Sequence, residues 1–465
     1  MVNLLLNTDS YKFSHYRQYP PGTTHVSSYI ESRGGRFDEV VFFGIQAWIK
    51  ENLLSPITKG DVDEFADVAA AHGFVPNVAG ANRILNQHGG YLPVSIEAAP
   101  EGSVIPTRNV LLQVVNTDPE LYWLTSFLET SLLRAVWYPS TVATLSREAK
   151  KRIYQGLKLT SDDPDGQIPF KLHDFGARGA SSEETAALGG MAHLVNFMGT
   201  DTVSGIMAAR RYYGADMAGF SIPASEHSTM TAWGRDGEVD AYANMLKQFG
   251  GDGRLVACVS DSYDIWNAVD QLWGSELKEK VMNSGGTLVV RPDSGDPVSV
   301  PVEVIGRLMN IFGYTVNNKG FKVLPDYVRV IQGDGMTLDN ISNVISAMEE
   351  RKLSVDNIAF GMGAGLLQKV DRDTQKFAMK ASAAKVNGEW RDVYKDPVTD
   401  QGKASKKGRQ ALVYECGLGS CSYRTKEAKY VDERRRNTLV MRPIYRNGEL
   451  LVDDDFETVR KRAKL

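Results

Sequence analysis

The feature of this sequence that most constrains its fold is a regular alternation between residues 168 and 385. Short apolar segments end in polar residues or glycine, and an amphipathic helical segment follows each of them. Apolar strands that alternate with helices are typical of parallel sheets covered by helices. The seven strand ends are "FKLHDFGARG", "LVNFMGTD", "GFSIPASEH", "RLVACVSDSYD", "TLVVRPDSGD", "VRVIQGDG" and "IAFGMGAG". The alternation predicts an α/β fold with an irregular (β/α) barrel, and an open doubly wound sheet is the alternative.

The segments outside this alternation predict a second domain. Residues 1–165 mix strand-like runs with helical ones, and residues 386–465 look like hairpins that return to the N-terminal part. We therefore predict a discontinuous α+β domain of residues 1–165 and 386–465, and a barrel-like catalytic domain of residues 166–385. An eighth barrel strand is expected from "FAMKASAA", which begins at Phe377, or from the region before the barrel.

Composition and charge exclude several classes of protein. The 465 residues carry a net charge of −4, which argues against a dominant nucleic-acid-binding surface. No uncharged apolar run approaches the roughly 18 residues of a membrane span, and the N-terminus lacks the features of a signal peptide. Cys258, Cys416 and Cys421 are too few for a disulfide framework, so we expect loop or core thiols in a reducing compartment. These features predict a cytoplasmic protein with neither nucleic acid nor membrane as a partner.

Polar residues gather at the strand ends. The carboxyl ends of barrel strands meet on one face, where active sites form. For any single residue a cap or a turn is the simpler interpretation, but seven such endings on one face favour a functional site. The residues are His173, Asp174, Phe175, Arg178, Asp201, Glu226, His227, Asp261, Asp264, Arg291, Asp293, Asp334, Gly361 and Gly363.

The mixture of side chains favours a phosphorylated substrate. Arg178, Arg291 and Arg372 are fork-shaped donors suited to phosphate, and "GDG" and "GMGAG" allow close backbone approach after the last two strands. Several carboxylates suggest a divalent ion, Mg²⁺, held partly by substrate phosphates, and we assign no direct protein ligand to it. No Walker-type phosphate loop occurs in the sequence. The residues alone predict a barrel enzyme for a multiply phosphorylated, sugar-like substrate, without naming the reaction.

A series of motifs resembles the nicotinamide phosphoribosyltransferase family over nearly the whole chain. They include "TDSYKFSHYRQYPPGT", "KLHDFGARG", "HLVNFMGTDTVSG", "EHSTMTAWG", "VSDSYDIWNA", "RPDSG", "VIQGDG", "LLQKVDRD" and "SKKGR", in this order. The resemblance implies a type II phosphoribosyltransferase barrel in a homodimer with shared active sites. It also implies a pentosyltransferase of NAD salvage, which joins nicotinamide to 5-phosphoribosyl 1-pyrophosphate and releases pyrophosphate. ATP is the implied co-substrate.

The resemblance also implies how nicotinamide is held. Phe175 would stack on one face of the pyridine ring, and Tyr11, from the partner subunit, on the other. Asp201 would accept a hydrogen bond from the carboxamide, with Arg178 and Arg291 near the same ligand.

The matching histidine of this family is phosphorylated by ATP, so His227 would be the nucleophile. Asp261 and Asp293 complete the implied catalytic set, and Asp261 or Glu226 would orient the imidazole ring. The residues implied for the phosphoribose and pyrophosphate are Arg33, Arg178, Arg291, Asp293, Gly333, Asp334, Gly363, Ala364, Arg372, Lys380 and Lys403.

Two alternative functions stay open at this point. A nicotinate phosphoribosyltransferase must hold a carboxylate where this chain places Asp201, whose charge would repel it. A non-catalytic sensor of nucleotides would not need His227, Arg291 and Asp293, which are all present.

Overall fold

The computed structural model describes residues 3–399, 404–417, 420–431 and 438–465. The chain divides into two compact units. The first contains Met1–Thr144, Arg211–Ala215 and Asp371–Lys464, and the second contains Leu145–Arg210 and Asp216–Val370. The divisions predicted from the sequence, at 165/166 and 385/386, differ from the bounds of these two units.

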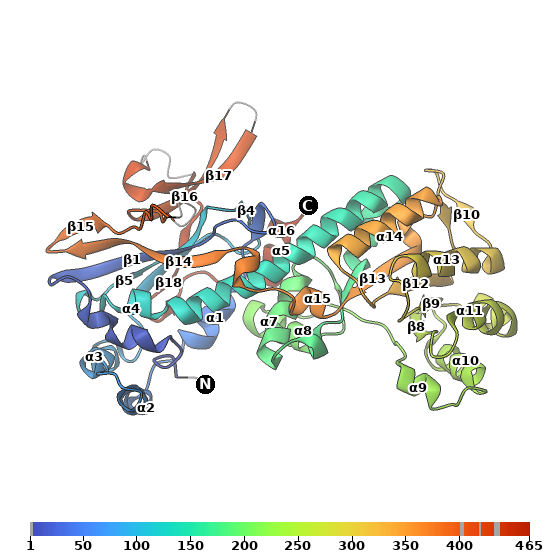
Figure 1. Ribbon diagram of the computed structural model, residues 1–465, viewed down its shortest axis with the longest axis horizontal. Coiled ribbons are helices and arrows are strands. Elements are labelled where there is room, and N and C mark those ends of the chain that lie inside the picture. Colours follow the sequence, from blue (N-terminus) through green and yellow to red (C-terminus); the bar gives the residue numbers. More distant parts are fainter. Residues whose placement is uncertain (1–2, 400–403, 418–419, 432–437) are drawn as a thin grey trace. The chain divides into compact units, whose positions relative to one another are not determined.

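The second unit is built on a curled parallel sheet in the order β7-β6-β13-β12-β9-β8. Figure 1 labels its strands β8, β9, β12 and β13. β7 lies beside β6, the strands β8, β9, β12 and β13 follow one another across the sheet, and the last strand, β13, lies beside the first, β6. The strands are β6 (Leu172–Asp174), β7 (Gly199–Thr200), β8 (Leu255–Val259), β9 (Thr287–Arg291), β12 (Val328–Gln332) and β13 (Ile358–Met362). Six of the seven predicted strand segments therefore form regular strands of one sheet.

The seventh predicted segment, "GFSIPASEH", joins the two edges of this sheet. Parallel bridges connect Gly199 of β7 with Phe220, and Ala224 with Ala257 of β8. The amide of Ala257 donates to the Pro223 carbonyl at 2.9 Å, and the amide of Thr200 donates to the Phe220 carbonyl at 3.0 Å. A doubly wound sheet keeps two free edges. The irregular barrel is confirmed and the doubly wound alternative is wrong.

Alternate side chains of the strands fill the barrel interior. Ala257, Val289 and Ile331 form a small buried cluster there, against which Ala359 packs. Successive side chains of a strand point to opposite faces, so Val330 and its counterparts point outward to the helices. The interior is closed by these apolar side chains, and polar groups are left for the carboxyl ends of the strands.

Amphipathic helices follow the strands. In α14 the side chains of Leu338, Ile341, Val344, Ile345 and Met348 are buried at helical spacing, and the Thr337 hydroxyl caps the first turn. The helices and short helical segments of this region are α6 (Pro164–Gln167), α7 (Glu183–Leu194), α8 (Val203–Tyr213), α9 (His227–Thr231), α10 (Glu238–Phe249), α11 (Ile265–Asn267), α12 (Lys278–Met282), α13 (Ser299–Phe312), α14 (Leu338–Glu350) and α15 (Ala364–Leu367). A two-stranded ribbon, β10 (Thr315–Val316) and β11 (Lys322–Val323), follows α13.

The first unit contains an antiparallel sheet in the order β15-β14-β1-β5-β3-β18-β19. Figure 1 labels its strands β1, β5, β14, β15 and β18. The strands are β1 (Thr23–Ser32), β3 (Val94–Ala98), β5 (Val110–Asn116), β14 (Phe377–Val386), β15 (Glu389–Asp392), β18 (Arg442–Arg446) and β19 (Glu449–Leu450). The segment "FAMKASAA" forms β14, which pairs antiparallel with β1, so that Tyr29 lies opposite Lys380. Its prediction as an eighth barrel strand is wrong, because its hydrogen-bonding partners belong to this second sheet.

Helices and two small two-stranded sheets complete the first unit. The helices are α1 (Ile45–Asn52), α2 (Lys59–Ala71), α3 (Val78–His88), α4 (Leu124–Phe127), α16 (Phe456–Ala463) and the long α5 (Glu129–Thr160), which contains the division at 144/145. Two small two-stranded sheets also belong to it: β2 (Glu39–Val41) pairs with β4 (Val104–Pro106), and the β16–β17 hairpin joins β16 (Gln410–Gly417) and β17 (Ser420–Glu427).

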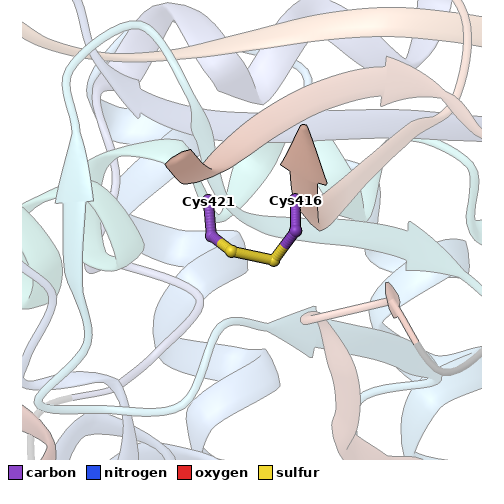
Figure 2. The surroundings of a disulfide bond; sticks show 2 residues. All are labelled: Cys416 and Cys421. Atoms are coloured by element: carbon purple, nitrogen blue, oxygen red, sulfur yellow. A yellow bond between two sulfur atoms is a disulfide. The ribbon is translucent and has the colours of Figure 1, made fainter. Parts of the chain in front are cut away.

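The β16–β17 hairpin carries a disulfide bond between Cys416 and Cys421 (Figure 2). The two residues lie opposite each other in the hairpin register. The expectation that both are unpaired thiols is therefore wrong, whereas Cys258 is a buried free thiol.

Within the described part of the chain, every helix is too short or too polar to cross a membrane.

Candidate active site

Phe175 lies at the mouth of the barrel, directly after β6. Its amide donates to the Met362 carbonyl at 3.0 Å, which fixes the backbone to β13. Its ring lies over two glycines: a Cβ on Gly361 would lie 2.0 Å from Phe175 Cε2, and one on Gly333 would lie 3.1 Å from it. The glycines of "GDG" and "GMGAG" that face the mouth therefore make room for this ring, which the sequence did not indicate.

Asp201 follows β7 at the same end of the barrel. Its side chain is exposed, and its Oδ1 atom accepts a hydrogen bond from the Ser221 hydroxyl. Its amide donates to the carbonyl of Asp174, the residue before Phe175, at 2.9 Å. Asp201, the predicted carboxamide acceptor, is thus tied to the residue next to Phe175, the predicted stacking residue.

His227 is the first residue of α9, and its side chain is 46% exposed. Nδ1 lies 3.0 Å from the Ser262 hydroxyl. Nε2 lies 3.7 Å from Oδ1 of Asp261 and 3.6 Å from Oδ2 of Asp293. The structure therefore brings the three predicted catalytic residues together. The carboxylate of Glu226 accepts a hydrogen bond from Ser228, and its role in orienting the ring stays a prediction.

The two carboxylates beside His227 are held by different groups. The Arg291 guanidinium donates to Oδ1 of Asp293, at 2.7 Å from Nη2 and 3.2 Å from Nε. Oδ2 of Asp261 accepts hydrogen bonds from the Asp293 amide, at 3.1 Å, and from the Ser294 hydroxyl. Oδ1 of Asp261 is buried and completes no hydrogen bond within the described residues. One oxygen of this pair is thus left available on the side that faces the histidine.

Arg291 also connects this cluster with Phe175. The centre of its guanidinium lies 5.7 Å from the centroid of the Phe175 ring, within the range of a cation–π contact. The strand ends β6, β8 and β9 and the start of α9 therefore present one continuous set of aromatic, cationic and acidic groups. Asp264 is not part of this set, since its carboxylate caps α11 by accepting from the amides of Trp266 and Asn267.

The remaining predicted residues of this unit lie on turns after β6, β12 and β13. Arg178 is exposed on the turn Ala177–Gly179, and Asp334 is exposed after β12. Gly363 and Ala364 lie at the start of α15, where a Cβ on Gly179 would lie 2.9 Å from Cβ of Ala364. The turns after β6 and β13 therefore approach each other closely at Gly179.

His173 lies one residue before Asp174 on β6. Burial lowers the pKa of the His173 imidazole, while the negative charge of Asp201 acts in the opposite direction. A Cβ on Gly199 would lie 2.7 Å from the His173 ring. The imidazole therefore packs against the backbone of β7 as a neutral group at physiological pH.

Arg33, one of the predicted anion-binding cations of the first unit, is held by a buried carboxylate. Arg33 Nε donates to Glu31 at 3.0 Å, and the Lys406 ammonium forms an ion pair with the other oxygen of Glu31. The Glu31 side chain is only 4% exposed. Nη2 of Arg33 is buried and completes no hydrogen bond within the described residues.

A second carboxylate, Glu129, lies between two lysines of the same unit. It forms an ion pair with Lys12 and lies 3.6 Å from Nζ of Lys380. Burial lowers the pKa of Lys380, and the charge of Glu129 opposes that shift. Arg372 is exposed and pairs with its neighbour Asp373 at 3.0 Å. Lys403 lies outside the described residues.

Tyr11 lies on the 3₁₀ segment Ser10–Arg17 of the first unit and is 55% exposed. The edge of its ring contacts His15, with the centroids 4.8 Å apart, and the Lys12 ammonium lies 5.3 Å from its centroid. An aromatic side chain held on one side and open on another is suited to stacking against a further flat group.

Sequence reasoning missed four side chains that hold the predicted site residues: Ser221, Ser262, Glu31 and Glu129. Ser262 is next to Asp261 in "VSDSYD". Arg33 directly follows β1 and is only two residues from Glu31, so the short spacing of this pair carried a signal. The contacts of Ser221 and Glu129 are with residues far away in the sequence, and no local pattern indicates them.

The comparisons with known proteins agree over the whole chain. Residues 170–443 match the nicotinate phosphoribosyltransferase (NAPRTase) family, and residues 3–96 match the nicotinamide phosphoribosyltransferase N-terminal domain. A nicotinamide phosphoribosyltransferase of Xanthomonas campestris pv. campestris (strain 8004) is 52% identical over 99% of this chain and 98% of its own length. One of Acinetobacter baylyi is 32% identical over 99% of this chain and 97% of its own length.

The fold has solved counterparts. The crystal structure of a nicotinate-nucleotide pyrophosphorylase from Pyrococcus furiosus matches with a TM-score of 0.61 and 16% identity, over 99% of this chain and 95% of that one. This likeness supports the type II phosphoribosyltransferase fold. The two family matches and the full-length relatives show that the chain belongs to the nicotinate phosphoribosyltransferase family and, within it, to the nicotinamide phosphoribosyltransferases, which are pentosyltransferase enzymes.

Proposed function

We propose that this enzyme makes nicotinamide mononucleotide and pyrophosphate from nicotinamide and 5-phosphoribosyl 1-pyrophosphate, as a step of NAD salvage. The bond between ribose C1 and the pyrophosphate oxygen breaks, and pyrophosphate leaves with the electron pair. The pyridine nitrogen of nicotinamide then forms the new bond to C1 and becomes cationic. Positive charge develops on the ribose in between, so the protein acts by positioning the reactants and by stabilising the departing anion.

The observation that carries the choice of nicotinamide is the placement of Asp201. Its carboxylate is exposed at the barrel mouth, and its backbone is bonded to the residue before Phe175. A carboxylate accepts a hydrogen bond from a carboxamide N–H and repels the carboxylate of nicotinate. Phe175 supplies the flat surface for the pyridine ring, with Arg291 over it and Arg178 on the turn beyond it. The neutral amide is therefore favoured over nicotinate.

Different cations and backbone turns bind different parts of the phosphorylated substrate. Arg291, Asp293 and Arg178 bind the phosphoribose at the barrel mouth. The turns at Gly333, Asp334, Gly363 and Ala364 line the ribose 5′-phosphate. Arg33, Arg372, Lys380 and Lys403 supply positive charge for the pyrophosphate.

His227 is proposed to accept the γ-phosphoryl group of ATP. One ring nitrogen forms the bond to phosphorus while the bond to the ADP oxygen breaks, and the ring loses its proton to a neighbouring carboxylate or to water. Asp261 and Asp293 flank Nε2 at 3.7 and 3.6 Å, which suits them to orient the ring and to stabilise its protonated form. Hydrolysis of the phosphohistidine would then drive synthesis forward.

Mg²⁺ fits this site only as a shared ion. Asp261 Oδ1 is a buried carboxylate oxygen without a hydrogen-bond partner in the described part of the chain, which is the kind of ligand that Mg²⁺ prefers. The described residues contain no group of three or more acidic, histidine or cysteine side chains arranged for a metal. Asp261 and Asp293 would hold the ion together with phosphate oxygens, where it neutralises the charge of the polyphosphate.

The second face of the pyridine is proposed to be covered by Tyr11 of a partner subunit in a homodimer. Its exposed ring, held from behind by His15, is suited to this contact. Each active site would then use a barrel from one chain and a tyrosine from the other.

The experiment that tests this function measures pyrophosphate release from phosphoribosyl pyrophosphate with nicotinamide, with and without ATP. We expect release that depends on nicotinamide and is stimulated by ATP, and an ATP stimulation that is lost in His227→Ala. Binding of the substrates without release of pyrophosphate would instead support a non-catalytic sensor. Release that occurs with nicotinate and not with nicotinamide would support the alternative transferase.

A further inference from the structure

Asp174 is a buried acidic residue to which the proposed reaction gives no role. It ends β6, directly before Phe175, and its side chain is 0% exposed. Because Phe175 points into the barrel mouth, the alternation along the strand directs Asp174 outward, under the covering helices. Burying a carboxylate in such surroundings lowers the stability of the fold unless hydrogen bonds compensate for the lost hydration.

The hydrogen bonds of Asp174 connect it with both predicted nicotinamide-binding segments. Its Oδ1 atom accepts from the Gly176 amide at 2.7 Å, which fixes the turn that follows Phe175. Its carbonyl accepts from the Asp201 amide at 2.9 Å, which fixes the start of the other segment. One residue thus holds the backbone on the far side of Phe175 and at Asp201.

The surroundings of Asp174 leave no space for a ligand on the outer side of the sheet. A Cβ on Gly190 of α7 would lie 3.3 Å from its Oδ2 atom and 2.8 Å from Cγ2 of Thr202. A Cβ on Gly205 of α8 would lie 2.8 Å from the backbone of Gly190. The two helices therefore meet backbone to backbone above the carboxylate, which excludes direct contact between Asp174 and substrate.

One polar atom of the carboxylate is left incompletely paired. Neither Oδ2 of Asp174 nor the hydroxyl of Thr202 completes a hydrogen bond among the residues that the structure describes, although the hydroxyl is near enough to lower the pKa of the carboxyl. Burial has the larger effect and raises the pKa of Asp174 to about 6. The site keeps an acid in place at a cost to stability, as positions with a functional constraint do.

We propose that Asp174 is a positioning residue for nicotinamide: its carboxyl group locks the Phe175 turn and its carbonyl locks Asp201, so that stacking and amide recognition occur at a fixed separation. The inference rests on the proposed function of Phe175 and Asp201. It assigns Asp174 no contact with substrate and no part in ATP coupling.

Two substitutions of nearly equal size separate the polar role from packing. Asp174→Asn keeps an oxygen for the Gly176 amide and adds an N–H₂ that can donate to Thr202, whereas Asp174→Leu removes both possibilities. In Asp174→Leu we expect the KM for nicotinamide to rise about tenfold, with the KM for phosphoribosyl pyrophosphate within about twofold of the wild-type value, as for the loss of one buried hydrogen bond. The preference for nicotinamide over nicotinate in kcat/KM should fall as well. Asp174→Asn should restore both values.

The control variant is Val330→Ala on the outer face of β12, which is also 0% exposed. It should lower the free energy of unfolding as a core truncation does and leave the KM for nicotinamide unchanged. If Asp174→Leu does not fold, Asp174→Ala takes its place with the same measurements. A folded Leu or Ala variant with wild-type KM and preference would overturn the proposal, and so would an Asn variant as impaired as the Leu variant.

Amide hydrogen exchange keeps the test independent of the proposed function. In the full-length protein without substrate, peptides covering residues 175–180 should exchange faster in Asp174→Leu than in the wild type, and Asp174→Asn should exchange at the wild-type rate. Unchanged exchange in the Leu variant would contradict the positioning role. A wild-type protein that releases no pyrophosphate with nicotinamide would contradict the proposed function instead. The exchange result would still decide the role of Asp174.

Discussion

The ring of Phe175 occupies the space that a side chain at Gly361 would need, since a Cβ there would lie 2.0 Å from Phe175 Cε2. The aromatic residue of one strand end therefore depends on the absence of a side chain on the neighbouring strand. The orientation of the ring is set by β6 and β13 together, which makes it testable without altering Phe175.

Gly361→Ala should displace the Phe175 ring from its position at the barrel mouth. Loss of offset stacking is worth on the order of 0.5–1.5 kcal/mol, so the KM for nicotinamide should rise several-fold. Steady-state kinetics with nicotinamide as the varied substrate measures this. Gly306→Ala in α13 is the matched control, because a Cβ at that position would meet no atom within 4 Å. Equal effects of the two substitutions would argue against a role for the Phe175 position.

Ser262→Ala should impair phosphorylation of His227. The Ser262 hydroxyl lies 3.0 Å from Nδ1 of the ring, and without it one imidazole nitrogen loses its partner. We expect the rate of labelling by γ-phosphate-labelled ATP to fall about tenfold, as for the loss of one hydrogen bond, and Ser262→Thr to keep most of it. His227→Ala defines the background of the assay. A Ser262→Ala protein that is labelled at the wild-type rate would remove Ser262 from the phosphorylation step.

Glu101 should make stability depend on pH between about 4.5 and 7. Burial raises the pKa of this carboxyl from 4.5 to about 7, although Tyr213 donates to it at 2.7 Å and backbone amides of α1 donate as well. The folded state then binds more protons than the unfolded state across this range, so stability falls as pH rises from 4.5 to 7. This pKa shift corresponds to a change in the free energy of unfolding of roughly 3 kcal/mol at most.

Denaturant unfolding of Glu101→Gln at pH 5 and at pH 7.5 measures this contribution. The difference in the free energy of unfolding between the two pH values should shrink relative to the wild type. Glu457→Gln, at an exposed position of α16, should leave the difference unchanged. A Glu101→Gln protein with the full wild-type pH dependence would contradict the assignment.

Much of the barrel could be predicted from the sequence because its strands are short, apolar and separated by capped helices. All seven predicted strand ends lie at the sheet or join its edges, and the polar residues after them converge as expected, with His227, Asp261 and Asp293 in one cluster. The position of Asp264 shows the limit of such reasoning, since an acid after a strand also serves as a helix cap.

The partners of a strand could not be predicted from its pattern alone. β14 has the composition of a strand, but its pairing with β1 depends on residues about 350 positions away, such as Tyr29 opposite Lys380. The Cys416–Cys421 disulfide likewise follows from the register of a hairpin that the sequence only suggested. The contacts of Glu31 with Lys406 and of Glu129 with Lys380 are non-local in the same way.

A mixed dimer tests whether Tyr11 acts in the partner's site. Tyr11→Ala and His227→Ala homodimers should both be impaired, the first in nicotinamide binding and the second in ATP coupling. In a dimer of one chain of each kind, purified with two tags, one site regains both residues and the other lacks both. ATP-coupled activity should return to about half of the wild-type value per dimer if each active site of the two-fold symmetric dimer contains residues of both chains. No activity above that of the parent mutants would contradict the shared site.

The most direct measurement is a competition between equal concentrations of nicotinamide and nicotinate for phosphoribosyl pyrophosphate, with the products separated and weighed by mass spectrometry. We expect nicotinamide mononucleotide to be by far the larger product with the wild type. In Asp201→Asn, which keeps the shape and removes the charge, the ratio should fall by a factor that corresponds to about 1–3 kcal/mol. A wild-type enzyme that forms nicotinate mononucleotide as readily as the amide product would contradict the central assignment, and so would an Asp201→Asn enzyme with an unchanged product ratio.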